Sequence, residues 1–445
     1  MKAIAFWLVL CIFVAASFSF ALAQSGPGEP AGSPPKPRAD QAQQLHVTEY
    51  SLAPDKLAKA EALYETRTVL YLFGMVFGVV VLWILLKLRV APALRDLAGR
   101  ASKNGFVQTV IFVPLLLLLM AVISLPIDIY HHHISLAYGL SVQSWGSWAG
   151  DWGKAQGVSL IVTIPTVFAL FRIIRRSPQR WWFYFWVLTL PFLVLLIFLA
   201  PVVLDPMFNT FEPLEKTQPQ LVEQIEKVTQ RGGLKIPRDR MFEMEASAKV
   251  TTYNAYVTGI GSTKRVVVWD NTARDLTVPE TLFVFGHEMG HYVLNHVYKG
   301  LAFAAVMMLA GFWLGRRIVL AMLTRWGESW HIRSINDLAA LPVLMLALSL
   351  LTLIGEPIGN AFSRHIEHQA DIYGLEVTHG LFPNNGAVAA SSFQKLGEKS
   401  YDYPTPNPLL VFWSYSHPSI AERIRFCLRY DPWNTPAGPK YVKQN

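Results

Sequence analysis

Long stretches without charged residues recur along this chain of 445 residues. A helix that crosses a bilayer needs about 20 mainly apolar residues, within a range of about 17–25. Six stretches lack Asp, Glu, Lys and Arg altogether: residues 68–86, 106–127, 155–171, 181–204, 300–315 and 338–355. The fifth stretch is the shortest, and it ends at Arg316 and Arg317, whose long side chains can reach an interface. The pattern predicts six membrane-spanning helices.

A different pattern lies between the fourth and fifth apolar stretches. Residues 249–258 and 264–269 are rich in β-branched and aromatic side chains, and residues 259–263 between them contain two glycines. This combination predicts an antiparallel β-hairpin. An edge strand of this kind can bind an extended peptide through its backbone, although a purely structural hairpin has the same pattern.

The N-terminus combines Lys2, an apolar run and then Ala21-Leu22-Ala23, a small-x-small sequence typical of a signal-peptide cleavage site. Residues 24–45 are rich in Pro, Gly, Ser, Ala and Gln, as in a disordered linker. The first 23 residues are therefore expected to form a signal peptide or, alternatively, a retained first membrane helix.

Composition and charge support a membrane protein and indicate its orientation. The chain is 52% hydrophobic and 16% charged, against about 25% charged residues in an average soluble domain. Its net charge of +8 is concentrated in alternate loops between the apolar stretches. Residues 87–105, 172–180 and 316–337 carry net charges of +4, +4 and +2, whereas residues 128–154 carry −1. Basic loops face the cytoplasm. This distribution leaves little support for nucleic-acid binding.

The clearest chemical signal is His287-Glu288-Met289-Gly290-His291. On a helix, the two histidines lie one turn apart on the same face, where both can bind one Zn²⁺. Glu288 can then act as general base toward a zinc-activated water without being a ligand. Thr277-Val278-Pro279-Glu280 fits a capping box, which predicts that this helix begins just after Thr277. His296 lies off the face of His291, and we expect it to be structural.

A catalytic zinc site needs a third protein ligand and an open position. Glu367 and Asp371, which follow the sixth apolar stretch, are four residues apart and share one helical face. Glu367 is therefore a candidate ligand, and Asp371 a candidate acceptor for the ring N–H of a ligand histidine. His365 and His368 are alternative ligands, although only one face of this helix can meet the first.

Together, these motifs resemble the type I CAAX prenyl protease family of integral-membrane zinc endopeptidases, to which the heat-shock membrane protease HtpX is related. The resemblance rests on the His-Glu-x-x-His motif, on residues 363–371, and on weaker matches at residues 254–256 and 417–423. It implies one Zn²⁺ per chain, with three ligands and a general base: His287, His291, Glu367 and Glu288. It also implies a substrate-binding edge strand and two further residues near the scissile carbonyl: Asn254, Ala255, Tyr256, His417 and Arg423.

We therefore expect a mainly α membrane-helical bundle with a discontinuous zincin (gluzincin) catalytic domain that contains a small antiparallel β-hairpin or sheet. The expected function is zinc-dependent hydrolysis of membrane-associated or envelope polypeptides. The alternative is a non-catalytic membrane scaffold or transporter with a structural zinc site, which is usually closed by four protein ligands. The expected partners are a polypeptide substrate and the lipid bilayer, and no oligomeric state is predicted.

The expected segments follow from the apolar stretches and motifs. They are a signal peptide or first membrane helix (1–23), a linker and pre-membrane segment (24–66), four transmembrane helices (67–204), the first half of the catalytic domain (205–299), a transmembrane hairpin (300–360), the second half of the catalytic domain (361–430) and a tail (431–445). Under the charge rule, the zinc site faces the periplasm of a bacterial inner membrane. In the CAAX proteases this site faces the cytoplasm, so the resemblance and the charge rule disagree on its side.

Overall fold

The computed structural model describes residues 44–259 and 264–442. Within them, six helical segments are long and apolar enough to cross a membrane: Pro54–Lys87, Gly105–Ala137, Trp145–Arg176, Trp181–Phe208, His296–Trp326 and Leu338–Thr378. Each contains one of the charge-free stretches, so the prediction of six membrane-spanning helices is confirmed. The expected N-terminal signal peptide or membrane helix, residues 1–23, lies outside the described residues.

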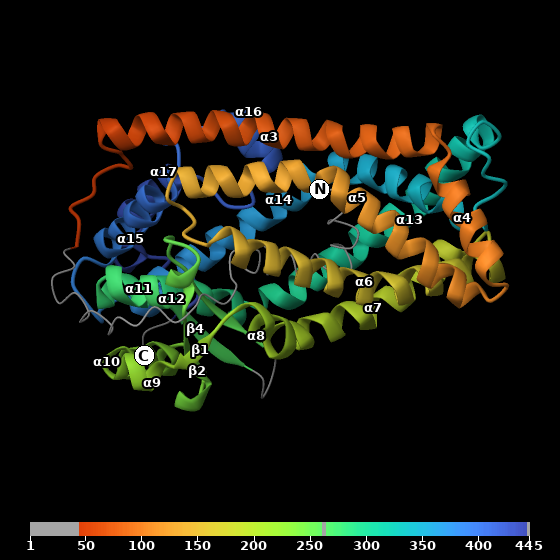
Figure 1. Ribbon diagram of the computed structural model, residues 1–445. Coiled ribbons are helices and arrows are strands. Elements are labelled where there is room, and N and C mark those ends of the chain that lie inside the picture. The colour runs from red at the N-terminus through yellow and green to blue at the C-terminus, as the bar shows by residue number, and fades with distance from the viewer. Residues whose placement is uncertain (1–43, 260–263, 443–445) are drawn as a thin grey trace.

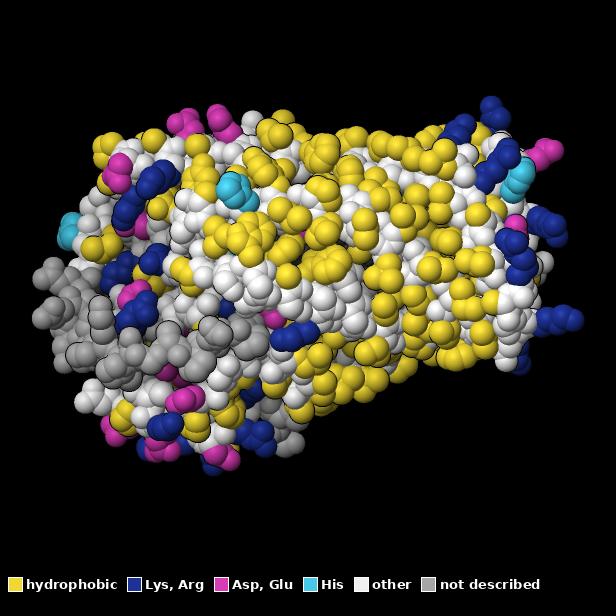
Figure 2. All heavy atoms as spheres, in the orientation of Figure 1, with side chains coloured by type: hydrophobic (Ala, Val, Ile, Leu, Met, Phe, Trp, Pro, Cys, Tyr) yellow, Lys and Arg dark blue, Asp and Glu magenta, His cyan; other side chains and the backbone are white. Residues whose placement is uncertain are grey.

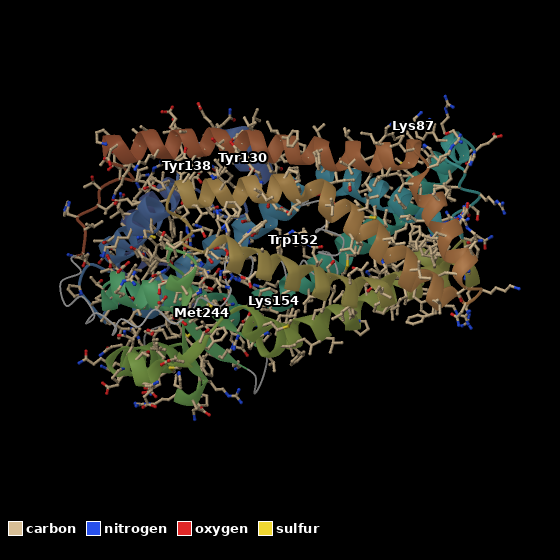
Figure 3. The ribbon with its side chains drawn as sticks, viewed as in Figure 1. Lys87, Tyr130, Tyr138, Trp152, Lys154 and Met244 are labelled. Carbon is tan, nitrogen blue, oxygen red and sulfur yellow. The ribbon has the colours of Figure 1, made fainter. Side chains whose placement is uncertain are left out.

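The membrane helices lie side by side along the long axis of the molecule (Figure 1). They are α3 (Pro54–Lys87), α5 (Gly105–Ala137), α6 (Trp145–Arg176), α7 (Trp181–Leu199), α13 (His296–Trp326) and α14 (Leu341–Thr378). A short helix, α4 (Val90–Ala101), joins α3 to α5. Lys87 lies at one end of the bundle and Met244 lies in the part that projects from the other end (Figure 3). The projecting part is built around a small sheet.

The sheet has four strands in the order β1-β2-β4-β3. They are β1 (Phe211–Pro213), β2 (Met241–Met244), β3 (Ala255–Thr258) and β4 (Arg265–Trp269). β3 and β4 pair antiparallel, as the hairpin prediction requires, and β3 is an edge strand. β2 and β4 pair in parallel, so the sheet is mixed rather than antiparallel as expected. Local sequence patterns miss this pairing because a crossover connects the two strands.

Helices from two distant parts of the chain surround the sheet. Those before the fifth membrane helix are α8 (Asp205–Phe208), α9 (Leu214–Thr217), α10 (Pro219–Arg231), α11 (Asp270–Asp275) and α12 (Val278–Val293). Those after the sixth are α15 (Asn385–Ser400), α16 (Pro408–Ser414) and α17 (Ile420–Arg429). Most of them share one hydrophobic core, to which α8 and α16 contribute no residue. Its buried members include Phe283 from α12, Tyr373 from α14 and Phe393 from α15. The unit around the sheet is therefore built from two separate parts of the chain, with α13 and the first part of α14 between them.

Charge divides the two ends of the molecule. In the space-filling view, an apolar band covers the bundle, and Lys and Arg side chains gather at the end opposite the sheet (Figure 2). These side chains come from the three basic loops of the sequence. At the sheet end, acidic and basic side chains are mixed. The chain enters α3 from the sheet end, where Tyr50 packs against α15 and donates a hydrogen bond to the carbonyl of Asp402.

Candidate active site

The His-Glu-x-x-His motif lies on α12, which begins as the capping box predicts. The Thr277 side chain accepts a hydrogen bond from the backbone N–H of Glu280, and the Glu280 side chain accepts one from the N–H of Thr277. The buried Glu280 carboxylate also pairs with Lys395 of α15 at 2.7 Å. α12 is therefore fixed at its start and packed on α15. His287 and His291 follow about three and four turns later on one face.

The partner of α12 is α14, and the two helices pack unusually close. A side chain at Gly374 of α14 would lie 3.0 Å from the backbone nitrogen of His287. A side chain at Gly290, inside the motif itself, would lie 3.0 Å from the Cβ of Tyr373. Glycines on both helices thus allow the backbones to approach, and this brings the Glu367 carboxylate of α14 to the two imidazoles of α12.

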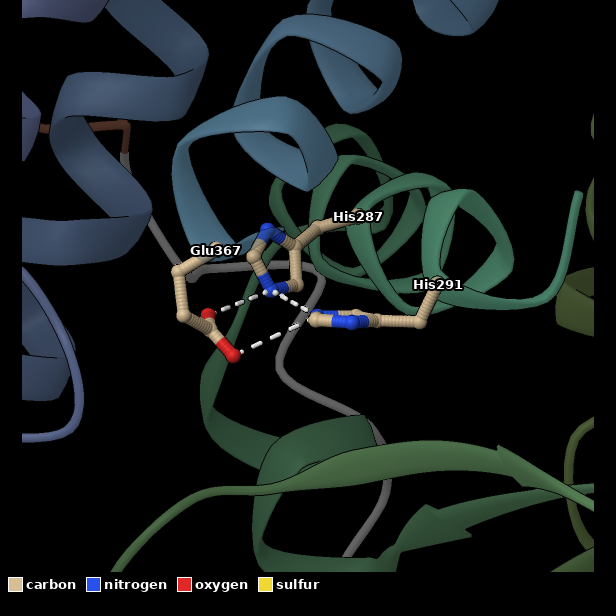
Figure 4. Close-up of side chains that lie close together, drawn as sticks. All are labelled: His287, His291 and Glu367. Atoms are coloured by element: carbon tan, nitrogen blue, oxygen red, sulfur yellow. Dashed lines mark hydrogen bonds and ion pairs between the residues drawn. The ribbon is translucent and has the colours of Figure 1, made fainter. Parts of the chain in front are cut away.

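Three side chains converge at this crossing (Figure 4). The Nε2 atoms of His287 and His291 are 3.2 Å apart. The Glu367 carboxylate lies 3.2 Å from Nε2 of His287 through one oxygen and 3.4 Å from Nε2 of His291 through the other. One potential ligand atom from each residue lies within 4.8 Å of the others. This is a three-ligand arrangement of two nitrogens and one oxygen.

The residues present fit a metal ion. Oε2 of Glu367 is buried and has no hydrogen-bond partner within the described part of the chain, although it points at the imidazoles. A buried carboxylate oxygen without a partner is costly, and a bound cation would satisfy it. Two His nitrogens and a carboxylate oxygen are a ligand set that catalytic zinc uses. Among the described residues, only these three form a cluster of this kind, so the closed four-ligand site of the scaffold alternative is not seen.

Behind His287 lies a buried ion pair. The Nδ1–H of His287 faces Oδ1 of Asp371 at 2.9 Å, and Arg423 of α17 binds both oxygens of the same carboxylate, at 3.0 and 2.5 Å. The guanidinium of Arg423 also lies over the ring of Phe393, 4.1 Å from its centroid. Arg423 is buried, and besides Asp371 its Nη2 lies 3.3 Å from Nδ1 of His287 and 3.9 Å from Oε2 of Glu367. The arrangement orients His287 and compensates the charge of Asp371.

Behind His291 lies a residue that the sequence interpretation did not connect to the site. Nδ1 of His296 is 3.2 Å from Nδ1 of His291, and Nε2 of His296 is 3.0 Å from the side-chain oxygen of Gln369. His296 is 3% exposed. Helical spacing alone places it off the face of His291, and the sequence contains no signal for the chain reversal that brings it back.

The pKa values of the motif residues differ because their surroundings differ. Burial lowers the pKa of His287, but its interactions with the carboxylates of Asp371 and Glu367 outweigh this and raise the value to about 9. Burial lowers the pKa of His291 to about 3. Burial raises the pKa of Glu288 to about 7, close to the neutral range in which a general base accepts and returns a proton.

The remaining predicted residues lie around this cluster. Nε2 of His417, in the loop after α16, is 3.3 Å from Oε1 of Glu367, and more than half of its side chain is exposed. Ala255 and Tyr256 lie on edge strand β3, next to Asn254. The Tyr256 hydroxyl points to Asp205 at 3.3 Å, and the strand packs on α12.

Comparison with known proteins agrees with this geometry. Residues 43–210 match the family model described as the CAAX prenyl protease N-terminal region with five membrane helices, and residues 215–430 match the model of peptidase family M48. The chain belongs to peptidase family M48. This chain is similar to the uncharacterized metalloprotease YhfN of Bacillus subtilis, with 36% identity over 374 residues. The alignment covers 84% of this chain and 86% of YhfN.

Further relatives share the same architecture. CAAX prenyl protease 1 of Saccharomyces cerevisiae is 26% identical over 332 residues, which covers 71% of each chain. The crystal structure of Ste24p from S. mikatae aligns with a TM-score of 0.74 at 21% identity, covering 95% of this chain and 98% of that one. The M48 chain is thus a multi-span membrane metalloendopeptidase with a Ste24p-like fold, and its family implies a bound metal, typically zinc.

Proposed function

We propose that this M48 protease hydrolyses membrane-associated or envelope polypeptides at a zinc site formed by His287, His291 and Glu367, on the periplasmic side of a bacterial inner membrane. The observation that carries the proposal is the convergence of these three side chains around a buried carboxylate oxygen that makes no hydrogen bond. These residues would hold a zinc ion, which would polarise a peptide carbonyl and lower the pKa of a bound water.

The protein side chains would perform the proton transfers. Glu288 follows the proposed ligand His287 directly on α12, and its carboxylate is not among the three groups of the cluster. It takes a proton from the attacking water and gives that proton to the leaving amine. A pKa of about 7 suits both steps, because the group must gain and lose the proton in each turnover.

His417 and Arg423 would act differently from each other. His417 is the more exposed of the two and lies at the open side of Glu367, where its Nε2–H is placed to stabilise a developing oxyanion. Arg423 is buried behind His287 and is bonded to Asp371. We therefore assign His417 to the substrate side and Arg423 to holding Asp371 in position.

Edge strand β3 is the proposed binding site for the substrate backbone. The N–H of Trp269 in β4 donates to the carbonyl of Asn254, and in an antiparallel pair such bonds recur at every second residue. The backbone groups of Tyr256 and Thr258 therefore face β4, whereas those of Ala255 and Val257 face the free edge. A peptide added as a further strand would bond to these two residues.

The charge distribution supports the proposed side of the membrane. Basic side chains gather at the end of the bundle opposite the sheet and α12 (Figures 1 and 2), and such residues favour the cytoplasmic side. The chain at residues 47–50 also packs at the site end, so it reaches α3 from the same side as the site. An N-terminal signal peptide, or a helix with Lys2 inside, would deliver it there.

The decisive test is Glu288→Gln in the full-length protein. We expect this variant to bind zinc like the wild type and to lose proteolysis, because it keeps all three ligands and removes the base. Zinc content and cleavage of a membrane-protein substrate pool would be measured together, with Glu245→Gln as an exposed control. Proteomics of fragments that accumulate with the inactive variant would identify substrates. Full proteolytic activity of Glu288→Gln would refute the mechanism.

Sidedness needs a separate experiment. A reporter active only in the cytoplasm, fused after Asn445, should be silent, and the same reporter inserted in the basic loop at residues 172–180 should be active. Strong cytoplasmic activity of the C-terminal fusion would place the zinc site inside and overturn the charge argument while leaving the chemistry intact.

A further inference from the structure

A chain of hydrogen-bonded side chains runs from the back of His291 toward the protein surface. His291 contacts His296 through Nδ1 at 3.2 Å, and Nε2 of His296 contacts Oε1 of Gln369 at 3.0 Å. Nε2 of Gln369 then contacts Nε2 of His365, again at 3.0 Å. His296 is buried and His365 is exposed, so the chain connects the interior of the site to solvent.

The proposed zinc site fixes the direction of every hydrogen bond in this chain. Nε2 of His291 points into the cluster, so Nδ1 carries the hydrogen and donates it to His296. His296 must accept at Nδ1 and therefore carries its own hydrogen on Nε2, which it donates to the carbonyl oxygen of Gln369. The amide group of Gln369 donates in turn to His365. No donor opposes another donor, so a single arrangement of hydrogens satisfies all four groups.

The backbone at Asn295 creates the first of these contacts. Asn295 is left-handed, with φ at 58°, a conformation that Asn tolerates better than most residues. It separates α12 from α13 and reverses the chain, so His296, the first residue of α13, returns toward His291. Gln369 and His365 lie one turn apart on α14, and ligand Glu367 lies between them in sequence. The row of hydrogen-bonded side chains therefore connects the start of α13 to the segment of α14 that carries the third ligand.

We propose that His296 and Gln369 are positioning residues that orient the zinc ligand His291 and fix its tautomer, in the role that Asp371 has for His287. The inference rests on the proposed zinc site. The two histidine ligands then differ in the groups that accept their Nδ1–H. His287 donates to the carboxylate of Asp371, which is paired with Arg423. His291 donates to the neutral imidazole of His296, which itself donates to the side-chain amide of Gln369. Outer contacts of this type commonly change metal affinity by about 10- to 100-fold when they are removed.

Substitutions at His296 separate hydrogen bonding from packing. His296→Ala removes the acceptor, whereas His296→Asn keeps an acceptor oxygen near the position of Nδ1. His133→Ala, at an exposed histidine of α5, serves as the matched control. The measurements are the zinc dissociation constant of the full-length protein in detergent, by competition with a chromophoric chelator, and the visible spectrum of the Co²⁺-substituted protein.

We expect His296→Ala to bind zinc about 10- to 100-fold more weakly and to show an altered Co²⁺ spectrum. His296→Asn should restore most of the affinity and the wild-type spectrum, and His133→Ala should match the wild type. Gln369→Ala, at a half-buried position, provides a second variant should His296→Ala fail to fold, and it should weaken zinc binding in the same direction.

Two results would overturn the inference alone: unchanged zinc affinity and Co²⁺ spectrum in His296→Ala and Gln369→Ala, or equal losses in His296→Ala and His296→Asn. The second result would mean that His296 acts by packing. A wild-type protein that binds no zinc would overturn the zinc site itself, and that outcome is distinguishable because it appears before any substitution is made.

Discussion

Gly374 of α14 touches the backbone of His287 on α12, so closely that an added Cβ would lie 3.0 Å from the His287 nitrogen. The contact lies two turns beyond Glu367, the proposed third ligand, and at the first histidine of the motif. The spacing between the two helices therefore sets the distance between the carboxylate and the imidazoles. Helix packing and metal geometry are determined by the same contact.

Gly374→Ala is expected to push α14 away from α12, because the neighbouring atoms are backbone and cannot move aside cheaply. Overpacking of this kind costs roughly 1–3 kcal/mol of stability. A displacement of about 1 Å at the ligands can reduce turnover by about 100-fold. Thermal unfolding and peptide cleavage would be measured for Gly374→Ala and for Gly359→Ala, which lies on the same helix with open space around it. Equal behaviour of the two variants would contradict the packing argument.

The ion pair behind His287 gives a second prediction. Arg423→Met leaves the buried carboxylate of Asp371 without its partner, which typically destabilises a protein by about 3–5 kcal/mol. Adding Asp371→Asn should recover much of that loss, since the double variant no longer buries a lone charge and Asn can still accept from His287. Chemical denaturation of the three variants checks this. Losses that simply add in the double variant would show that the two side chains act independently.

A third prediction concerns pH and stability. Burial, helped by the charge of Asp270, raises the pKa of Glu243 on β2 to about 7. Between the ordinary value of 4.5 and about 7, the folded state binds more protons than the unfolded state at this group, so stability falls as pH rises through that window. Above pH 7 the full cost of the buried charge remains.

Glu243→Gln should therefore raise stability at pH 8 and change it little at pH 4.5. One pKa unit corresponds to about 1.36 kcal/mol, and because Glu243 is only partly buried we expect a gain of about 1–2 kcal/mol at pH 8. Melting curves at both pH values would be compared with those of Glu245→Gln, two residues away and exposed. A gain of equal size at both pH values would exclude the titration of Glu243 as its cause.

Much of this architecture is predictable because its causes are local. The charge-free stretches identify the membrane helices, since a bilayer excludes charged side chains over a fixed thickness. They underestimate helix length, however: α3 begins at Pro54, well before residue 68, because its polar first turns extend beyond the apolar region. The helical spacing of His287 and His291 and the capping box at Thr277 are likewise properties of a single helix.

The rest depends on contacts between distant segments. The parallel pairing of β2 with β4 brings together strands separated by a crossover, and no local pattern specifies it. The contact between His296 and His291 depends on one left-handed residue, Asn295. Sequence spacing assumes a continuous helix, so it places His296 on the wrong side. Such residues become visible only when the path of the chain is known.

Helix α14 both crosses the bilayer and carries Glu367, the proposed third zinc ligand. It is one helix from Leu341 to Thr378, with Pro357 in its interior, and Glu367 lies twelve residues beyond the charge-free stretch. At 1.5 Å per residue, Glu367 lies about 18 Å along the helix axis from the end of the charge-free stretch. A tilt of α14 by about 5° would therefore displace Glu367 by roughly 1.5 Å. Bilayer thickness should then affect turnover, and we expect the enzyme to have an optimum acyl-chain length in reconstituted vesicles. Equal turnover across acyl-chain lengths would show that packing holds Glu367 in place whatever the tilt of α14.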